Sequence, residues 1–149
     1  MTVGRHRSKT VATWLALLVG SLGWHRLYLH GWGDRWAWLF PIPTLVGLYG
    51  VRRALTLGQD DTLSWLLIPL FGLMLAASML QAIVYGLTAD TLWNERFNRA
   101  SVQHRSGWLT VIGVVLALAL GAATLMATLA FSAQRFFEFQ IDQSRGTRP

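Results

Sequence analysis

Charged residues and histidines are gathered in short clusters along the chain, and two long stretches between the clusters contain none. Leu63–Leu87 is an apolar run of 25 residues, and Trp108–Ala133 is one of 26. A helix rises about 1.5 Å per residue, so either run is long enough to cross a hydrocarbon core of roughly 30 Å. Buried helices of soluble proteins are usually much shorter. The pattern therefore predicts two transmembrane helices.

The first third of the chain has two shorter apolar stretches. Val11–Trp24 contains 14 residues, and Trp36–Val51 contains 16 with two prolines inside it. The first reaches spanning length only if it continues through Leu29, with its last polar side chains reaching the headgroups. Proline removes a backbone donor, so the second helix is expected to be kinked or to start late, near Pro41 and Pro43. We expect a short helical hairpin in which each arm crosses once, with a polar turn near residues 30–35.

These segments predict an all-α integral membrane protein with four apolar helical segments, a short N-terminal helical hairpin plus two long transmembrane helices. The expected parts are a basic N-terminal tail (1–7), the hairpin (8–56), two further transmembrane helices with an interfacial connecting helix (57–134) and a C-terminal tail (135–149). A cleaved signal peptide is the alternative for the basic start and Val11–Val19, but the residues that follow match an A-x-A cleavage pattern poorly.

A motif after the first apolar stretch resembles a known family. Gly20–Gly31 reads Gly-Ser-Leu-Gly-Trp-His-Arg-Leu-Tyr-Leu-His-Gly. This is similar to the Gly-x-x-Gly-x-His-Arg-Phe-Tyr-Leu-Gly pattern of the two-transmembrane-helix (TM-two) domain family. The matching residues are Lys9, Gly20, Gly23, His25, Arg26, Tyr28 and Leu29. Leu27 replaces the family's phenylalanine, His30 its glycine, and Arg52 and Arg53 stand where an aspartate is common. The resemblance covers about residues 8–54, and it implies a membrane domain without an assigned reaction.

Small residues recur every four positions on the predicted helices, which lets helix backbones approach closely. One stripe is Ala12, Ala16 and Gly20; a second is Gly113, Ala117 and Gly121; a third is Ala119, Ala123 and Ala127. Gly23 follows the first stripe. Gln81 is the polar residue of the third segment whose amide needs an inter-helix partner. We interpret these positions as helix packing inside the chain; the alternative is that one stripe contacts another subunit.

Two groups of residues are expected at the membrane surface. His25, Arg26 and Tyr28 follow the first apolar stretch, where such side chains can bind lipid phosphates. In the loop before the last helix, Asp90 is a candidate helix cap, and Trp93 and Phe97 share one face of the helix that follows. That helix is expected to lie on the membrane, so we predict that all of these side chains except Asp90 contact lipid or a partner.

Composition and charge narrow the function classes. The 149 residues are 53% hydrophobic and 13% charged, whereas a soluble domain is about 25% charged. The absence of cysteine excludes disulfides, thiolate zinc sites and cysteine catalysis. The net charge of +6 is spread over the loops, so we expect no nucleic-acid partner. With four crossings, 8 basic residues lie on one side and 5 on the other, which predicts both termini in the cytoplasm. The TM-two resemblance suggests a bacterial inner membrane.

The predicted helices carry no ionisable relay, and no serine stands in a Gly-x-Ser-x-Gly elbow. A contact between His25 and Asp34 across the turn would not by itself make a catalytic site. We therefore expect a non-enzymatic accessory or structural subunit, without catalytic residues, metal or cofactor, that packs against membrane lipids and against other membrane proteins or itself. One alternative is lipid or small-ligand binding or transport through the hairpin and the Gln81 region. The other is a haem or metal enzyme subunit that uses His25, His30 and His104.

Overall fold

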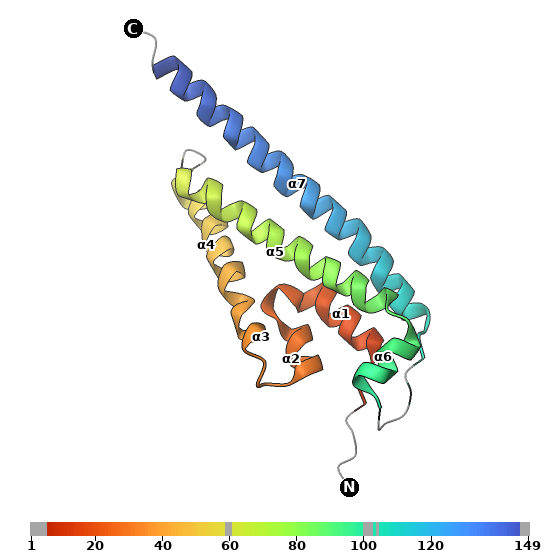
Figure 1. The fold of residues 1–149 in the computed structure, drawn as a ribbon. Coiled ribbons are helices and arrows are strands. Elements are labelled where there is room, and N and C mark those ends of the chain that lie inside the picture. The colour runs from red at the N-terminus through yellow and green to blue at the C-terminus, as the bar shows by residue number, and fades with distance from the viewer. Residues whose placement is uncertain (1–5, 59–60, 100–102, 104, 147–149) are drawn as a thin grey trace.

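A computed structural model describes residues 6–58, 61–99, 103 and 105–146, without the side chains of 145 and 146, and these residues form helices and turns but no strand (Figure 1). The helices are α1 (Lys9–Val19), the 3-10 turn η1 (Gly20–Leu22), α2 (Trp24–His30), α3 (Arg35–Leu39), α4 (Pro41–Leu57), α5 (Thr62–Leu87), α6 (Asp90–Phe97) and α7 (Trp108–Gly146). The all-helical fold class is confirmed.

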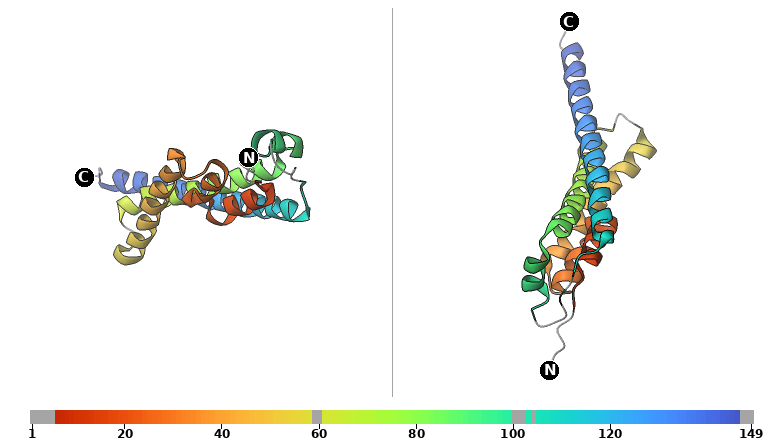
Figure 2. Two further views of the ribbon diagram at one scale, coloured as in Figure 1. Left: turned by 90° about the horizontal axis from the view of Figure 1, so that it is seen from below. Right: turned by 90° about the vertical axis from the view of Figure 1, so that its right-hand side faces the viewer.

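Helices α5 and α7 run side by side and form the spine of the molecule (Figures 1 and 2). Both are long and apolar enough to cross a membrane, with mean hydropathies of 2.1 and 2.4 in their most apolar windows. Only 17% of each window is buried inside the chain, which is unlike the core helix of a soluble protein. The two helices pack closely at Gly72, because a Cβ there would lie 2.0 Å from the Thr128 Oγ1 atom.

The C-terminal end of α7 differs from the expectation. The helix was expected to end at Ala133, but it continues to Gly146 and projects past the other helices (Figure 1). Hydropathy does not detect this part, because it is no longer uniformly apolar. Contacts along the helix stabilise it instead: the Arg135 guanidinium lies 2.6 Å from the Glu138 carboxylate, and the Gln134 amide donates to Glu138 at 2.8 Å.

The first arm of the predicted hairpin does not form one helix through Leu29, which corrects the sequence interpretation. The chain turns back at η1 and at Gly23, whose φ of 79° lies in the left-handed region that favours glycine. A Cβ on Gly23 would also lie 2.3 Å from the Ala37 carbonyl oxygen. The start of α1 and the end of α2 both lie beside α6, where Lys9 contacts Asp90 and the His30 ring packs on Phe97. The α1–α2 pair therefore enters and leaves at one end of the bundle.

The second arm starts late, as expected. Helix α4 begins at Pro41, in the first turn of a helix, where a missing backbone donor is tolerated. Helix α4 packs closely on α5: a Cβ on Gly47 would lie 2.5 Å from the Phe71 backbone nitrogen. At the far end of α4, the Arg53 Nε atom lies 2.6 Å from the Asp61 carboxylate, which also caps α5. This hydrogen bond from Arg53, with those from Ser64, lowers the pKa of Asp61 to about 2.

The two ends of the described chain lie at opposite ends of the bundle (Figure 1). Arg7 bonds to Asn98 beyond α6, whereas the last turns of α7 lie past the α4–α5 turn. The predicted cytoplasmic location of both termini stays a prediction. Within the bundle, the α1–α2 pair returns to the end at which it starts.

Candidate functional site

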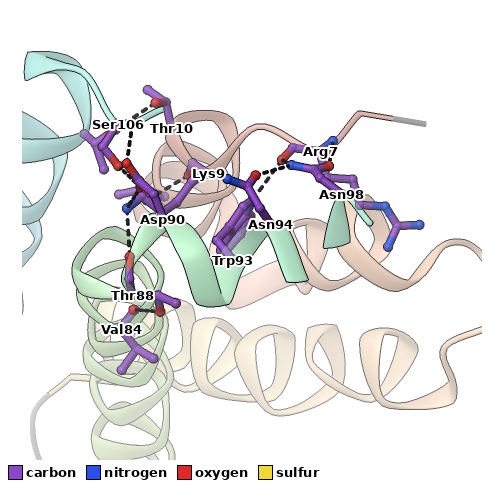
Figure 3. Close-up of polar contacts among 12 residues, drawn as sticks. Arg7, Lys9, Thr10, Val84, Thr88, Asp90, Trp93, Asn94, Asn98 and Ser106 are labelled. Carbon is purple, nitrogen blue, oxygen red and sulfur yellow. Dashed lines mark hydrogen bonds and ion pairs between the residues drawn. The ribbon is translucent and has the colours of Figure 1, made fainter. Parts of the chain in front are cut away.

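A buried ion pair joins the start of α1 to the start of α6 (Figure 3). The Lys9 side chain is almost fully buried, and its Nζ atom lies 2.7 Å from Asp90 Oδ1 and donates to the Thr88 carbonyl oxygen at 2.8 Å. The Ser106 backbone N–H also donates to Asp90. Burial alone would raise the pKa of the Asp90 carboxyl, but the hydrogen bonds from Lys9 and Ser106 outweigh it and hold the pKa well below its usual range.

A second set of hydrogen bonds fixes the rest of α6 to the segment before α1. Asn98 receives a hydrogen bond from the Arg7 backbone nitrogen at 2.8 Å, and the Trp93 indole donates to the Arg7 carbonyl at 2.9 Å (Figure 3). The Trp93 ring packs on Tyr85 of α5, with ring centroids 6.1 Å apart. Helix α6 is thus held in one position against α1 and α5.

Because α6 is fixed there, a cleft of about 640 Å³ opens between it, α2 and the last two turns of α5. This volume falls within the usual range for small-ligand sites. The apolar part of its lining is Leu29, Val84, Leu92 and Phe97, and the polar part includes Arg26, Gln81, Arg96 and Arg99. The cleft is therefore amphipathic, with cationic groups beside an apolar wall.

Electrostatics favour an anion in the cleft. Its lining has three arginines and one acid, Glu95. Arg26 is partly neutralised, since its Nε atom lies 2.9 Å from the Asp34 carboxylate; hydrogen bonding by this guanidinium is the main reason that the pKa of Asp34 is lowered. Within the residues that the structure describes, Arg96 and Arg99 form no ion pair, so their charges are available to a ligand.

The predicted surface residues separate into two groups. Arg26 and Phe97 line the cleft, as does Gln81, which the sequence analysis had linked with the hairpin. His25 and Trp93 are instead buried inside the chain, with 0% and 1% of their surfaces exposed, so we correct the expectation that they contact lipid or a partner. Tyr28 is half-buried, and its hydroxyl accepts a hydrogen bond from the Ser8 nitrogen at 2.9 Å.

The small-residue positions lie at helix contacts within the chain. Ala12, Ala16 and Ala117 are fully buried, and Gly113 lies beside Thr13 and Trp14 of α1. A Cβ on Gly20 would lie 2.8 Å from Ser78 Cβ, and one on Gly121 would lie 3.1 Å from Met79 Cβ. By contrast, the stripe of Ala119, Ala123 and Ala127 is exposed.

The histidines do not assemble into a metal or haem site in the described residues, where no group of three or more potential ligands is found. The His25 ring packs between Phe40 and Tyr85, whereas His30 lies on the other side of α2, 3.9 Å from Asp34. Asp34 therefore meets Arg26 and His30 and not His25. His104 lies outside the described residues.

Sequence reasoning missed Lys9, Asp90 and Asn98 as the residues that position α6. Asp90 was expected to cap the helix, but it is the first helical residue and its carboxylate points to Lys9. The sequence offered one signal: Lys9 lies just before the first apolar stretch, and Asp90 is the first acid after the third. Their partnership links residues 81 positions apart, which no local pattern records.

Comparisons with protein-family models, curated proteins and solved structures found no match. The resemblance to the TM-two family therefore stays a prediction.

Proposed function

We propose that the chain is a non-enzymatic integral membrane protein that self-associates through α7. In this arrangement α4, α5 and α7 each cross the bilayer, and the α1–α2 pair enters it and returns. The length, hydropathy and exposed apolar surface of α5 and α7 support the membrane assignment. For α4, the support is a row of exposed apolar side chains, among them Ile42, Leu45, Val46 and Leu48.

The topology can be tested because the natural chain has no cysteine. Single cysteines at His6, Gly33, Thr56 and Gln140 would be labelled with a membrane-impermeant maleimide in sealed cells and in inverted vesicles. We expect His6→Cys to react from the same side as Gly33→Cys, and Thr56→Cys and Gln140→Cys to react from the other. Labelling of His6→Cys together with Thr56→Cys would establish four crossings and contradict the re-entrant pair.

Self-association is supported by one observation, an exposed face of α7 that is apolar from Leu116 to Ile141 except at Gln134. Its residues alternate in steps of three and four, as in a coiled-coil seam: Leu116, Leu120, Ala123, Ala127, Ala130, Gln134, Phe137 and Ile141. At 100° per residue, this face lies about a third of a turn from the face that packs on α5. The small residues in its middle would let two helices approach closely.

The seam continues beyond the end of the bundle, where lipid no longer explains exposed apolar side chains. The Arg135 guanidinium lies 5.1 Å from the ring of Trp65, which places Arg135 level with the start of α5. From there α7 continues for 11 residues, or about 17 Å, with Phe137 and Ile141 at least half exposed. A second copy of α7, packed in parallel, would cover both the alanines and these side chains.

The test is the oligomeric state in mild detergent. The wild-type chain is expected to be a dimer, and Ala123→Leu/Ala127→Leu to lower the dimer fraction by about tenfold, because two bulky side chains separate the helices. Ala122→Leu is the matched control: Ala122 is exposed on the same helix but points away from both faces. The readout is mass by light scattering after gel filtration.

Oxidative crosslinking provides a second readout in native membranes. Ala130→Cys is expected to form a disulfide between copies, whereas Ala122→Cys is not. A wild-type monomer combined with no Ala130→Cys crosslink would overturn the proposal.

A further inference from the structure

The cleft lies at the end of α5, where the chain leaves its third apolar segment. Thr88 follows the last residue of α5, and α6 then covers the end of the helix. Gln81 lies about 9 Å deeper than Leu87 along the helix axis, at 1.5 Å per residue. In the membrane arrangement proposed above, on which this inference rests, the cleft extends from the level of the lipid headgroups into the upper part of the hydrocarbon region.

Its cationic groups come from α2 and from the end of α6. Arg96 lies with its guanidinium carbon 5.9 Å from the Phe97 ring centre, and the Arg99 Nε atom donates to the Glu95 backbone carbonyl. Both side chains are exposed. Guanidinium groups bind phosphate oxygens with paired hydrogen bonds, so arginines that lack acidic partners favour a phosphate-bearing ligand over a neutral one.

Gln81 adds an independent observation. It is half-buried on a mostly apolar helix, and within the described residues its amide has no hydrogen-bond partner. A polar group at this depth is costly unless a partner satisfies it. The position of Gln81 below the arginines fits the ester and glycerol oxygens of a lipid whose phosphate binds above.

We propose that this cleft binds the headgroup of an anionic phospholipid, with the phosphate at Arg96 and Arg99, the glycerol oxygens at Gln81 and an acyl chain along the wall of Leu29 and Val84. The ligand chemistry is a glycerol phosphate ester. The apolar wall and the depth of Gln81 favour a membrane lipid over a free phosphate ester. This site is separate from the α7 seam, so it does not depend on self-association.

The test uses the full chain, delipidated in dodecyl maltoside and titrated with phosphatidylglycerol, with bound lipid counted by native mass spectrometry. Arg96→Gln/Arg99→Gln is expected to weaken phosphatidylglycerol binding about 25-fold, since each arginine near an anionic headgroup contributes about a factor of five. The matched control is Arg35→Gln/Arg105→Gln. It removes the same charge from exposed arginines that do not line the cleft, and it is expected to retain wild-type binding.

Gln81→Leu separates binding from folding. Leucine fits the apolar surroundings, so thermal stability is expected to stay the same or rise while phosphatidylglycerol binding falls about fivefold. Phosphatidylcholine and sn-glycerol 3-phosphate are titrated in parallel. Equal binding of phosphatidylcholine would overturn the assignment of an anionic ligand. Equal binding of sn-glycerol 3-phosphate would overturn the assignment of a lipid. An equal loss in the Arg35→Gln/Arg105→Gln control would show diffuse surface charge and overturn the site.

Discussion

Gly23→Ala is expected to destabilise the chain by about 3 kcal/mol. The turn between α1 and α2 depends on the left-handed backbone at Gly23 and on its close approach to Ala37, and the substitution affects both. The backbone at Gly23 has a φ of 79°, which an alanine adopts only at a cost of about 1–2 kcal/mol. The added methyl group would also lie 2.3 Å from the Ala37 carbonyl oxygen, so α3 must move. The measurement is the free energy of unfolding in mixed micelles, followed by circular dichroism during titration with dodecyl sulfate.

Two other glycines separate these effects. Gly31 has a φ of 84° with a ψ of −179°, a region that is essentially limited to glycine, and open space around its Cβ position, so Gly31→Ala is expected to cost about 1–3 kcal/mol through the backbone alone. Gly33 has open space and an ordinary φ, and Gly33→Ala is expected to be neutral. A Gly23→Ala loss no greater than the left-handed backbone cost of about 1–2 kcal/mol would show that contact with Ala37 does not hold the turn.

Asp90→Leu is also expected to lower stability strongly, because it leaves the buried Lys9 ammonium without its ion-pair partner. Breaking a buried ion pair costs about 3–5 kcal/mol, and the partial exposure of Asp90 places this one at the lower end of that range. We expect α6 to detach locally, with faster hydrogen exchange of its amides. The double variant Lys9→Met/Asp90→Leu removes both charges and is expected to recover part of the loss.

The matched control is Glu138→Gln, which weakens the Arg135–Glu138 contact within one turn of α7. Pairs three residues apart on one helix contribute about 0.2–0.5 kcal/mol, so little change is expected. An equal loss in Asp90→Leu and Glu138→Gln would show that the Lys9–Asp90 pair does not hold α6.

The stabilisation by Asp90 should depend on pH in one direction. The pKa of its carboxyl is lowered in the folded state, so its contribution is fully present above the unfolded value near 3.9 and is lost as the pH falls toward the folded value. The difference in stability between wild type and Asp90→Leu should therefore be constant from about pH 5 to pH 8 and shrink below about pH 4. A difference that grew on acidification would contradict the assigned ion pair.

The parts of the fold that sequence predicts well are those with a uniform local signal. Helix α5 was expected from Leu63 to Leu87 and runs from Thr62 to Leu87, because its boundaries coincide with the loss of apolar residues. The end of α7 was missed because its last turns depend on side-chain pairs such as Arg135–Glu138 and not on hydropathy. The break between α1 and α2 was missed although Gly20 and Gly23 were noticed, since spacing alone does not distinguish close helix packing from a reversal of direction.

The candidate cleft could likewise be predicted only in part, because one of its walls depends on contacts between distant residues. The alternative interpretation placed a ligand at the hairpin and the Gln81 region, and Arg26 and Gln81 do line one cleft. The wall formed by α6 could not be predicted, since its position depends on Lys9 and Arg7, more than 80 residues earlier in the chain.

The contact between the start of α1 and the start of α6 has a consequence for the order of events during synthesis. Lys9 reaches its acceptors only after Thr88 and Asp90 have been made. Ser106, which donates a hydrogen bond to Asp90, is made later still. At about 5–20 residues per second, the first helix therefore waits about 4–16 s for its partners after leaving the ribosome. During that time the Lys9 ammonium has neither of these acceptors. Helix α1 is thus synthesised early and fixed late, once α6 has been made.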